Sequence, residues 1–211
     1  MKKFELTNEF ITNMFGTKLF RIRALVEFGD VEAGELGGYV EKESNLGHDD
    51  NAWVYDNAWV YGNARVYGDA QVSGDARVYG NAWVYGDAQV SGDALVYGNA
   101  RVYGNAWVCG NAWVYGNAWV YGNALVCSDE DYAYAHGFGS VNRTTTFFRL
   151  KDGGVGVRCG CFYGTLAQFR DKIRETHGET KKAQEYLMLA DLMELRFEED
   201  ENEVGNRKYV E

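Results

Sequence analysis

The sequence of 211 residues contains no proline, only three histidines and only four cysteines. Without proline, every residue of a hydrogen-bonded stack of strands can donate its amide hydrogen to the next layer. Four cysteines do not suggest a disulfide framework, and we predict that all four are reduced thiols of a cytoplasmic protein. No apolar run approaches the length of a membrane span, and the first residues are not typical of a signal peptide. We therefore expect no membrane partner.

Basic residues are also few relative to acidic ones. The chain has 21 Lys and Arg against 31 Asp and Glu, which gives a formal net charge of −10 at pH 7. Binding to duplex nucleic acid requires a broadly basic surface, so we expect no duplex nucleic acid partner. Much of the negative charge lies in residues 198–203, which we interpret as a solvated acidic tail.

A six-residue repeat fills the middle of the chain. From residue 52 to residue 129 the phrase Ala-x-Val-x-Gly-(Asn/Asp) recurs thirteen times, with no insertion or deletion and few substitutions. Side chains alternate between the two faces of a strand, so Ala and Val point one way and the variable residues point the other way. Gly-Asn and Gly-Asp are suited to a corner. The repeat therefore predicts a solenoid whose lumen is filled by Val and Ala.

This pattern resembles the hexapeptide-repeat family, a left-handed parallel β-helix with three six-residue units per coil. The matching residues include units such as 54–59 and 60–65, in which an aliphatic residue is followed four positions later by a small one. The stretch 34–43 (Gly-Glu-Leu-Gly-Gly-Tyr-Val-Glu-Lys-Glu), leading into Asn-Ala-x-Val repeats, is similar to a group of bacteriophage and prophage members. The resemblance implies that residues 18 apart stack, that the protein is a homotrimer, and that it acts in the cytoplasm of a phage host.

We divide the chain into three parts and expect a mainly β fold. Residues 1–51 form an N-terminal cap with a strand at 18–27 and an irregular opening coil at 34–51. Residues 52–129 form the left-handed β-helix. Residues 130–211 form a small α+β module, with strands at 141–150 and 155–161 in a hairpin and helices at 165–177 and 181–197.

Stacking at a spacing of 18 residues sorts the outward side chains into columns. One column reads Arg65, Trp83, Arg101, Trp119, and a guanidinium placed over each indole would form a cation–π ladder. Two further columns are entirely tyrosine, and all six tryptophans of the chain are expected to point outward. Such a surface is usually covered, here by another copy of the chain. The alternative is aromatic stacking along the sheet without any cover.

These side chains suggest a non-catalytic protein that binds a small anionic, nucleotide-like ligand. Arginine binds phosphate and aromatic rings stack on bases. In a phage setting the ligand would be a signal of host defence that the protein sequesters. Alternatively, the arginines only offset the acidic surface. The candidate ligand-binding residues are Arg65, Trp83, Arg101 and Trp119 of the repeats, and His136, Arg143, Thr144, Thr145, Arg149 and Arg158 of the C-terminal module.

Two other functions stay open. Acyltransferases with hexapeptide repeats commonly use a histidine as general base in a cleft between subunits, but residues 52–129 contain no histidine and no inserted loop. We expect no catalytic residue; in an enzyme it would be His48 or His136. We expect no cofactor, and no cluster has the spacing of metal ligands. The third interpretation is a structural spacer or virion-associated scaffold whose C-terminal module docks a protein.

Overall fold

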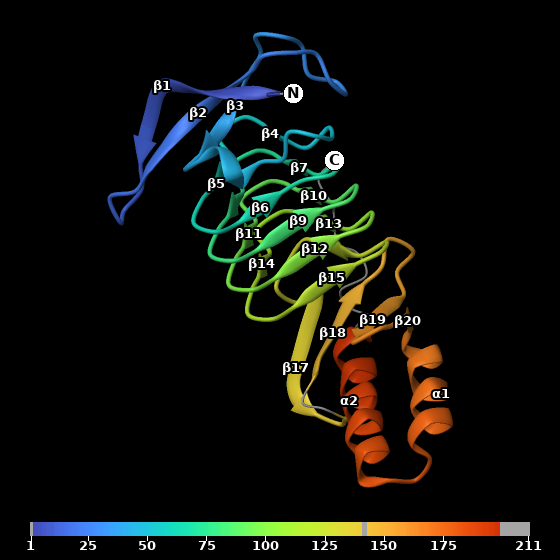
Figure 1. The fold of residues 1–211 in the computed structure, drawn as a ribbon. Coiled ribbons are helices and arrows are strands. Elements are labelled where there is room, and N and C mark those ends of the chain that lie inside the picture. Colours follow the sequence, from blue (N-terminus) through green and yellow to red (C-terminus); the bar gives the residue numbers. More distant parts are fainter. Residues whose placement is uncertain (1, 141–142, 199–211) are drawn as a thin grey trace.

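The computed structural model describes residues 2–140 and 143–198. It shows a parallel β-solenoid with an antiparallel cap at its N-terminal end and an α+β module at its C-terminal end (Figure 1). The predicted mainly β solenoid is confirmed. Residues 141–142 of the expected hairpin, and all of the acidic run after Glu198, lie outside the described residues.

Each six-residue unit forms one strand of two or three residues, which pairs in parallel with the strands 18 residues before and after it. Arg101, for example, pairs with Trp83 on one side and Trp119 on the other, as predicted. The first sheet contains β4 (Trp53–Val54), β7 (Gln71–Val72), β10 (Gln89–Val90), β13 (Trp107–Val108) and β16 (Leu125–Val126). The second contains β6 (Arg65–Val66), β9 (Trp83–Tyr85), β12 (Arg101–Tyr103) and β15 (Trp119–Tyr121). The third contains β5 (Trp59–Val60), β8 (Arg77–Val78), β11 (Leu95–Val96) and β14 (Trp113–Val114).

The lumen of the solenoid is built as the repeat predicts. Every repeat alanine from Ala52 to Ala124 and every repeat valine from Val54 to Val126 is fully buried. Burying a valine stabilises the fold by about 1.5–3 kcal/mol, so the stacked valines supply most of the cohesion between coils. In the first unit Asp56 replaces the corner glycine and adopts a positive φ of 52°.

The N-terminal cap is an antiparallel hairpin joined to the solenoid. β1 (Phe4–Thr12) pairs with β2 (Lys18–Ala24), and β2 pairs with β3 (Leu36–Val40), which in turn pairs in parallel with β5. A short 3-10 helix η1 (Glu43–Asn45) follows, and Leu46 then bridges Val66. The opening coil therefore pairs with the first full coil. The expected strand at 18–27 is β2, whereas β1 was not predicted.

One tryptophan departs from the prediction that all six point to the outside. Trp53 is fully buried, with its ring centroid 6.2 Å from that of Phe4 and 5.3 Å from that of Phe28. The prediction is wrong here because the cap covers the first coil and encloses this indole. The other five tryptophans lie on the outside of the coils.

The C-terminal module is a four-stranded antiparallel sheet with two helices packed on one face (Figure 1). Its strands are β17 (Tyr132–Phe138), β18 (Arg143–Arg149), β19 (Val155–Cys159) and β20 (Phe162–Thr165), and its helices are α1 (Leu166–His177) and α2 (Lys181–Phe197). Both helices were predicted, whereas β17 and β20 were not. Alternate residues of β18 face opposite ways, so Phe147 packs among the helices and Phe148 packs against the solenoid core.

A disulfide joins Cys109 and Cys127, whose Cα atoms are 4.3 Å apart. The prediction of four reduced thiols is wrong for this pair, because the 18-residue register places the two side chains at equivalent positions of successive coils. Cys159 and Cys161 are free, the first half-buried and the second exposed.

Candidate functional site

The predicted ladder of arginine and tryptophan is present along the second sheet. The guanidinium carbon of Arg101 lies 4.9 Å from the ring centroids of both Trp83 and Trp119, and that of Arg65 lies 6.0 Å from Trp83. Arg158 of strand β19 continues the ladder, 5.4 Å from Trp119. Arg101 comes from the coil before Trp119 and Arg158 from the module that follows the last coil. Trp119 is therefore covered on both faces and cannot stack on a base.

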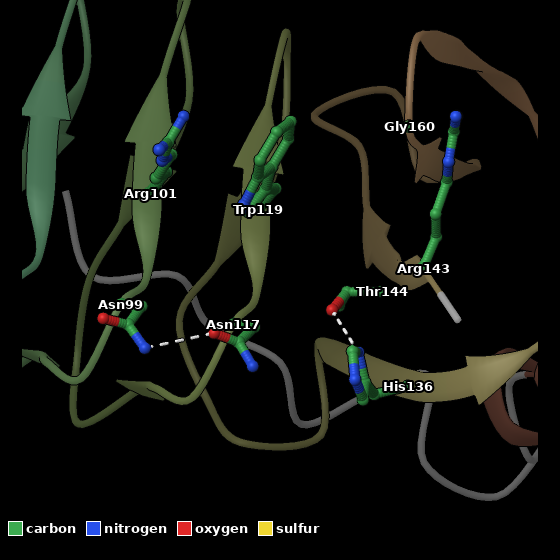
Figure 2. Close-up of a pocket in the computed structure, with 8 residues that line it drawn as sticks. All are labelled: Asn99, Arg101, Asn117, Trp119, His136, Arg143, Thr144 and Gly160. Atoms are coloured by element: carbon green, nitrogen blue, oxygen red, sulfur yellow. Dashed lines mark hydrogen bonds between the residues drawn. The ribbon is translucent and has the colours of Figure 1, made fainter. Parts of the chain in front are cut away.

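A pocket of about 480 Å³ opens where this ladder meets the C-terminal module. Two adjacent coils supply one wall and the module supplies the other (Figure 2). The lining residues are Asn99, Arg101, Asn117 and Trp119 from the solenoid, and His136, Arg143, Thr144 and Gly160 from the module. The structure thus brings together five residues that the sequence suggested as ligand-binding: Arg101, Trp119, His136, Arg143 and Thr144.

A cross-strand hydrogen bond orients His136 at the edge of this pocket. His136 in β17 is paired with Thr144 in β18, and their Nδ1 and Oγ1 atoms are 3.0 Å apart (Figure 2). The imidazole is exposed, and among the described residues its Nε2 atom has no hydrogen-bond partner, so it can meet a bound molecule. The pair therefore offers a ring nitrogen and a hydroxyl group at fixed positions.

Asparagines from successive coils form a second ladder that ends at the pocket. Nδ2 of Asn63 donates to Asn81, Asn81 donates to Asn99, and Asn99 donates to Asn117, each over 3.2 Å. Within the described residues no further asparagine follows in this column, so Nδ2 of Asn117 remains as a donor. Sequence reasoning missed Asn99 and Asn117, although their spacing of 18 residues was a usable signal.

The pocket is cationic in an acidic protein. Its lining includes two guanidinium groups, Arg101 and Arg143, and no carboxylate. In residues 2–140 and 143–198, no carboxylate lies within ion-pair distance of either group. The two charges are therefore available to an anion, and an arginine fork matches the geometry of phosphate or carboxylate oxygens.

Two of the predicted ligand-binding residues lie in the interior instead. Arg149 is buried, with its Nε atom 3.4 Å from an oxygen of Asp131, and it donates a hydrogen bond to the Phe197 carbonyl. Thr145 is buried and donates to the sulfur of Cys159 over 3.2 Å. Both side chains face the module because the pleat of β18 turns alternate residues away from the solenoid. A ligand on the surface cannot reach them, which corrects the prediction at these positions.

The remaining candidates lie elsewhere. Arg158 is half-buried in the ladder and donates to the Phe162 carbonyl over 3.3 Å. Arg65 and Trp83 belong to earlier coils and line a different pocket.

His48 lies in the N-terminal cap, away from the Arg101–Arg143 pocket. Its ring stacks on Phe4 with centroids 4.4 Å apart, and its Nδ1 atom accepts a hydrogen bond from the backbone N–H of Lys3 over 3.3 Å. Burial lowers the pKa of this histidine. These contacts give His48 a packing role in the cap.

Comparison with known families identifies the solenoid. The chain is similar to the YdcK β-solenoid repeat over residues 58–70, 70–86, 88–104, 96–110 and 106–122. The chain is a repeat β-helix protein. The matched segments all lie within the coils and cover less than half of the chain, so they describe neither the cap nor the module. No curated protein matches this repeat β-helix chain.

No helix in the described part of the chain is long and apolar enough to cross a membrane. The same residues contain no group of three or more His, Cys, Asp or Glu side chains that could hold a metal ion.

Proposed function

We propose that this repeat β-helix protein is a non-catalytic binding protein that holds a small phosphate-bearing ligand between Arg101 and Arg143. The observation that supports this proposal is that two guanidinium groups, without a carboxylate partner among the described residues, line one pocket. A phosphate bound in this pocket would receive charge-assisted hydrogen bonds from guanidinium N–H groups. Hydrogen bonds to charged groups are worth about 1.5–3 kcal/mol each.

The rest of the pocket favours a nucleotide-like molecule over a bare anion. The amides of Asn99 and Asn117 and the His136–Thr144 pair are suited to hydroxyl and carbonyl groups next to the phosphate. The volume of about 480 Å³ lies within the usual range of about 300–1,000 Å³ for small-molecule sites. Because Trp119 is covered on both faces, the ladder serves as a rigid wall and the ligand is held by its polar groups.

The biological setting that we propose follows from the resemblance of residues 34–43 and the repeats to bacteriophage and prophage proteins. In a host cytoplasm, such a protein would sequester a nucleotide signal of host defence.

The proposed homotrimer has support from the third sheet, where Trp113 and Tyr115 are 47% and 41% exposed. Neighbouring exposed aromatic rings of this kind mark surfaces that a partner covers.

One observation favours a second candidate, the scaffold whose module docks a protein. Met188, Leu192 and Leu195 are 71%, 55% and 68% exposed on helix α2. Their spacing of four and three residues places them on one face of the helix. Co-purification of the protein with virions, and its loss on the triple substitution of these residues by serine, would support the scaffold over the sequestering protein.

Isothermal calorimetry with cyclic nucleotides and ADP-ribose nucleotides tests the proposed ligand. We expect at least one of them to bind micromolar protein, and Arg143→Gln to weaken this binding about tenfold or more. Arg174→Gln is the matched control, because Arg174 is an exposed arginine of helix α1 that pairs with Asp171 outside the pocket. Absence of heat with the whole panel, or equal weakening by both variants, would contradict the proposal.

A further inference from the structure

The tyrosines of the solenoid form two continuous ring stacks. In the third sheet the rings of Tyr61, Tyr79, Tyr97 and Tyr115 follow one another with centroids 5.0, 5.0 and 5.4 Å apart. In the second sheet the rings of Tyr67, Tyr85, Tyr103 and Tyr121 are 5.0, 4.7 and 4.3 Å apart. Each stack has two ends, where one ring face has no further tyrosine of the same column stacked on it.

At three of these four ends a larger residue occupies the next position. The C-terminal module contributes Tyr134, which meets Tyr115 edge-on at 6.0 Å, and Tyr163, which meets Tyr121 edge-on at 4.6 Å. At the N-terminal end of the stack in the third sheet, Glu41 lies in register with Tyr61, because Val40 pairs with Val60. The Glu41 carboxylate accepts a hydrogen bond from the backbone N–H of Gly62 over 2.6 Å.

The fourth end, at Tyr67, is different because a glycine lies in register with it. The N–H of Gly47 donates to the Val66 carbonyl over 2.8 Å, and Leu46 bridges Val66, so Gly47 occupies the position one coil before Tyr67. A Cβ atom on Gly47 would lie 3.1 Å from the Tyr67 Cβ. A pocket of about 240 Å³ remains at this step, lined by Ser44, Leu46, Gly47, Arg65, Tyr67 and Trp83.

The groups around this pocket are suited to a flat ring with an anionic substituent. Tyr67 offers a ring face. Arg65, two residues earlier in the chain, is exposed and lines the same pocket with its guanidinium. Within the described residues no carboxylate forms an ion pair with Arg65. We propose that this pocket binds a planar aromatic heterocycle of a small molecule, stacked on Tyr67 as one further step of the tyrosine column, with an anionic group held by Arg65.

The anionic group distinguishes this ligand from an aromatic side chain of a partner protein. A phenylalanine or tryptophan could fill the ring step, but it would leave Arg65 without an acceptor. A purine nucleoside monophosphate supplies both the ring and the charge. The site is formed by the first coil of the second sheet, whereas the Arg101–Arg143 pocket is formed by its last two coils and the module, so the two proposals stand independently.

Calorimetry in an Arg143→Gln background tests the ring site separately from the Arg101–Arg143 pocket. The three probes are adenosine monophosphate, adenosine and ribose 5-phosphate. We expect the monophosphate to bind, adenosine to bind more weakly, and ribose 5-phosphate to give no heat. Equal binding of ribose 5-phosphate, or no heat from the monophosphate, overturns the ring site and leaves the first pocket untouched.

Two substitutions then locate the bound ring. Tyr67→Leu should weaken binding of the monophosphate about fivefold or more, the range found when a stacking ring is removed. Tyr61→Leu is the matched control, since it makes the same change at the end where Glu41 lies in register, and it should leave the affinity unchanged. If Tyr67→Leu does not fold, Arg65→Gln replaces it, because that side chain is exposed and its loss should remove the preference for the monophosphate over adenosine. Equal affinities of the Tyr67 and Tyr61 variants, or an unchanged preference in Arg65→Gln, would overturn the proposal.

Discussion

The guanidinium carbon of Arg158 lies 5.4 Å from the ring centroid of Trp119, so strand β19 of the C-terminal module adds the last step to a ladder that begins at Arg65. The module is also held by Thr146, whose hydroxyl accepts a hydrogen bond from the backbone N–H of Trp119 over 3.0 Å, and by Phe148, which packs against the solenoid core. These three contacts fix the module, and with it Arg143, against the last coils that carry Arg101 and Trp119. The pocket is therefore bounded by two rigid walls.

Replacing Arg158 by glutamine should destabilise the protein by about 2 kcal/mol, because the half-buried guanidinium contacts both Trp119 and Tyr121. Arg77→Gln is the control, since among the described residues the Arg77 guanidinium lies over a single ring, that of Trp59 at 4.4 Å, and its loss should cost about 0.5–1 kcal/mol. Urea unfolding of both variants measures the difference. Equal losses of unfolding free energy would mean that Arg158 stabilises the junction no more than Arg77 stabilises the coils.

Gly104→Ala should destabilise the solenoid more than Gly137→Ala. Both glycines have positive φ, +70° and +89°, so both substitutions carry a backbone cost of about 1–2 kcal/mol. A Cβ on Gly104 would also lie 3.0 Å from the backbone nitrogen of Gly122 in the next coil, whereas nothing lies within 4 Å at Gly137. Overpacking of this kind adds about 1–3 kcal/mol. Unfolding free energies from urea titrations test this, and similar losses at the two positions would contradict tight stacking of the corners.

The solenoid could be predicted from the sequence because its contacts repeat at a fixed spacing. Once residues 18 apart stack, the lumen and the position of Arg101 between Trp83 and Trp119 follow. Strands β1 and β17 belong to no period and are stabilised by long-range pairing, so the sequence does not reveal them. The burial of Trp53 depends on the same long-range contacts of the cap.

The candidate site was predicted in part for the same reason. Arg101 and Trp119 lie in the periodic segment, so their positions followed from the register. Thr144 and Thr145 are adjacent in the sequence, and only the pairing of β18 with its neighbours decides which of them faces the solenoid. The presence of Arg143 and Arg101 in the lining of one pocket depends on how the module docks, which no local pattern specifies.

Lys3 should make the protein more stable as the pH rises from about 8 to 10. Its side chain is buried, its Nζ donates to the Ala52 carbonyl over 2.8 Å, and burial lowers its pKa from 10.5 to about 8, against the opposing effect of Asp50. Between these values the folded protein releases this proton while the unfolded chain keeps it. The unfolded state then binds more protons, so the free energy of unfolding increases with pH.

Urea unfolding of Lys3→Met across this range tests the assignment, because the variant should lack the increase. Lys2→Met is the control, since the adjacent Lys2 is exposed and pairs with Glu43. A pH dependence that is the same in the Lys3 variant and the control would show that another group causes it.

Tyr85 should lower the free energy of unfolding as the pH rises from about 10 to 12. Its ring lies between those of Tyr67 and Tyr103. Burial, followed by the neighbouring Tyr103 and Tyr67, raises its pKa from 10.0 to about 12, while Arg101 and Arg158 act in the opposite direction. The folded protein keeps this proton after the unfolded chain has lost it, so the stabilisation is complete below pH 10 and is lost as the pH approaches 12. Tyr85→Phe should therefore lose less stability over this range than the unsubstituted protein.

Urea unfolding as a function of pH measures this loss, with Tyr163→Phe as the control because Tyr163 is 39% exposed at the end of the same column. An equal reduction in both variants would assign the effect to the number of tyrosines and not to the enclosed position of Tyr85.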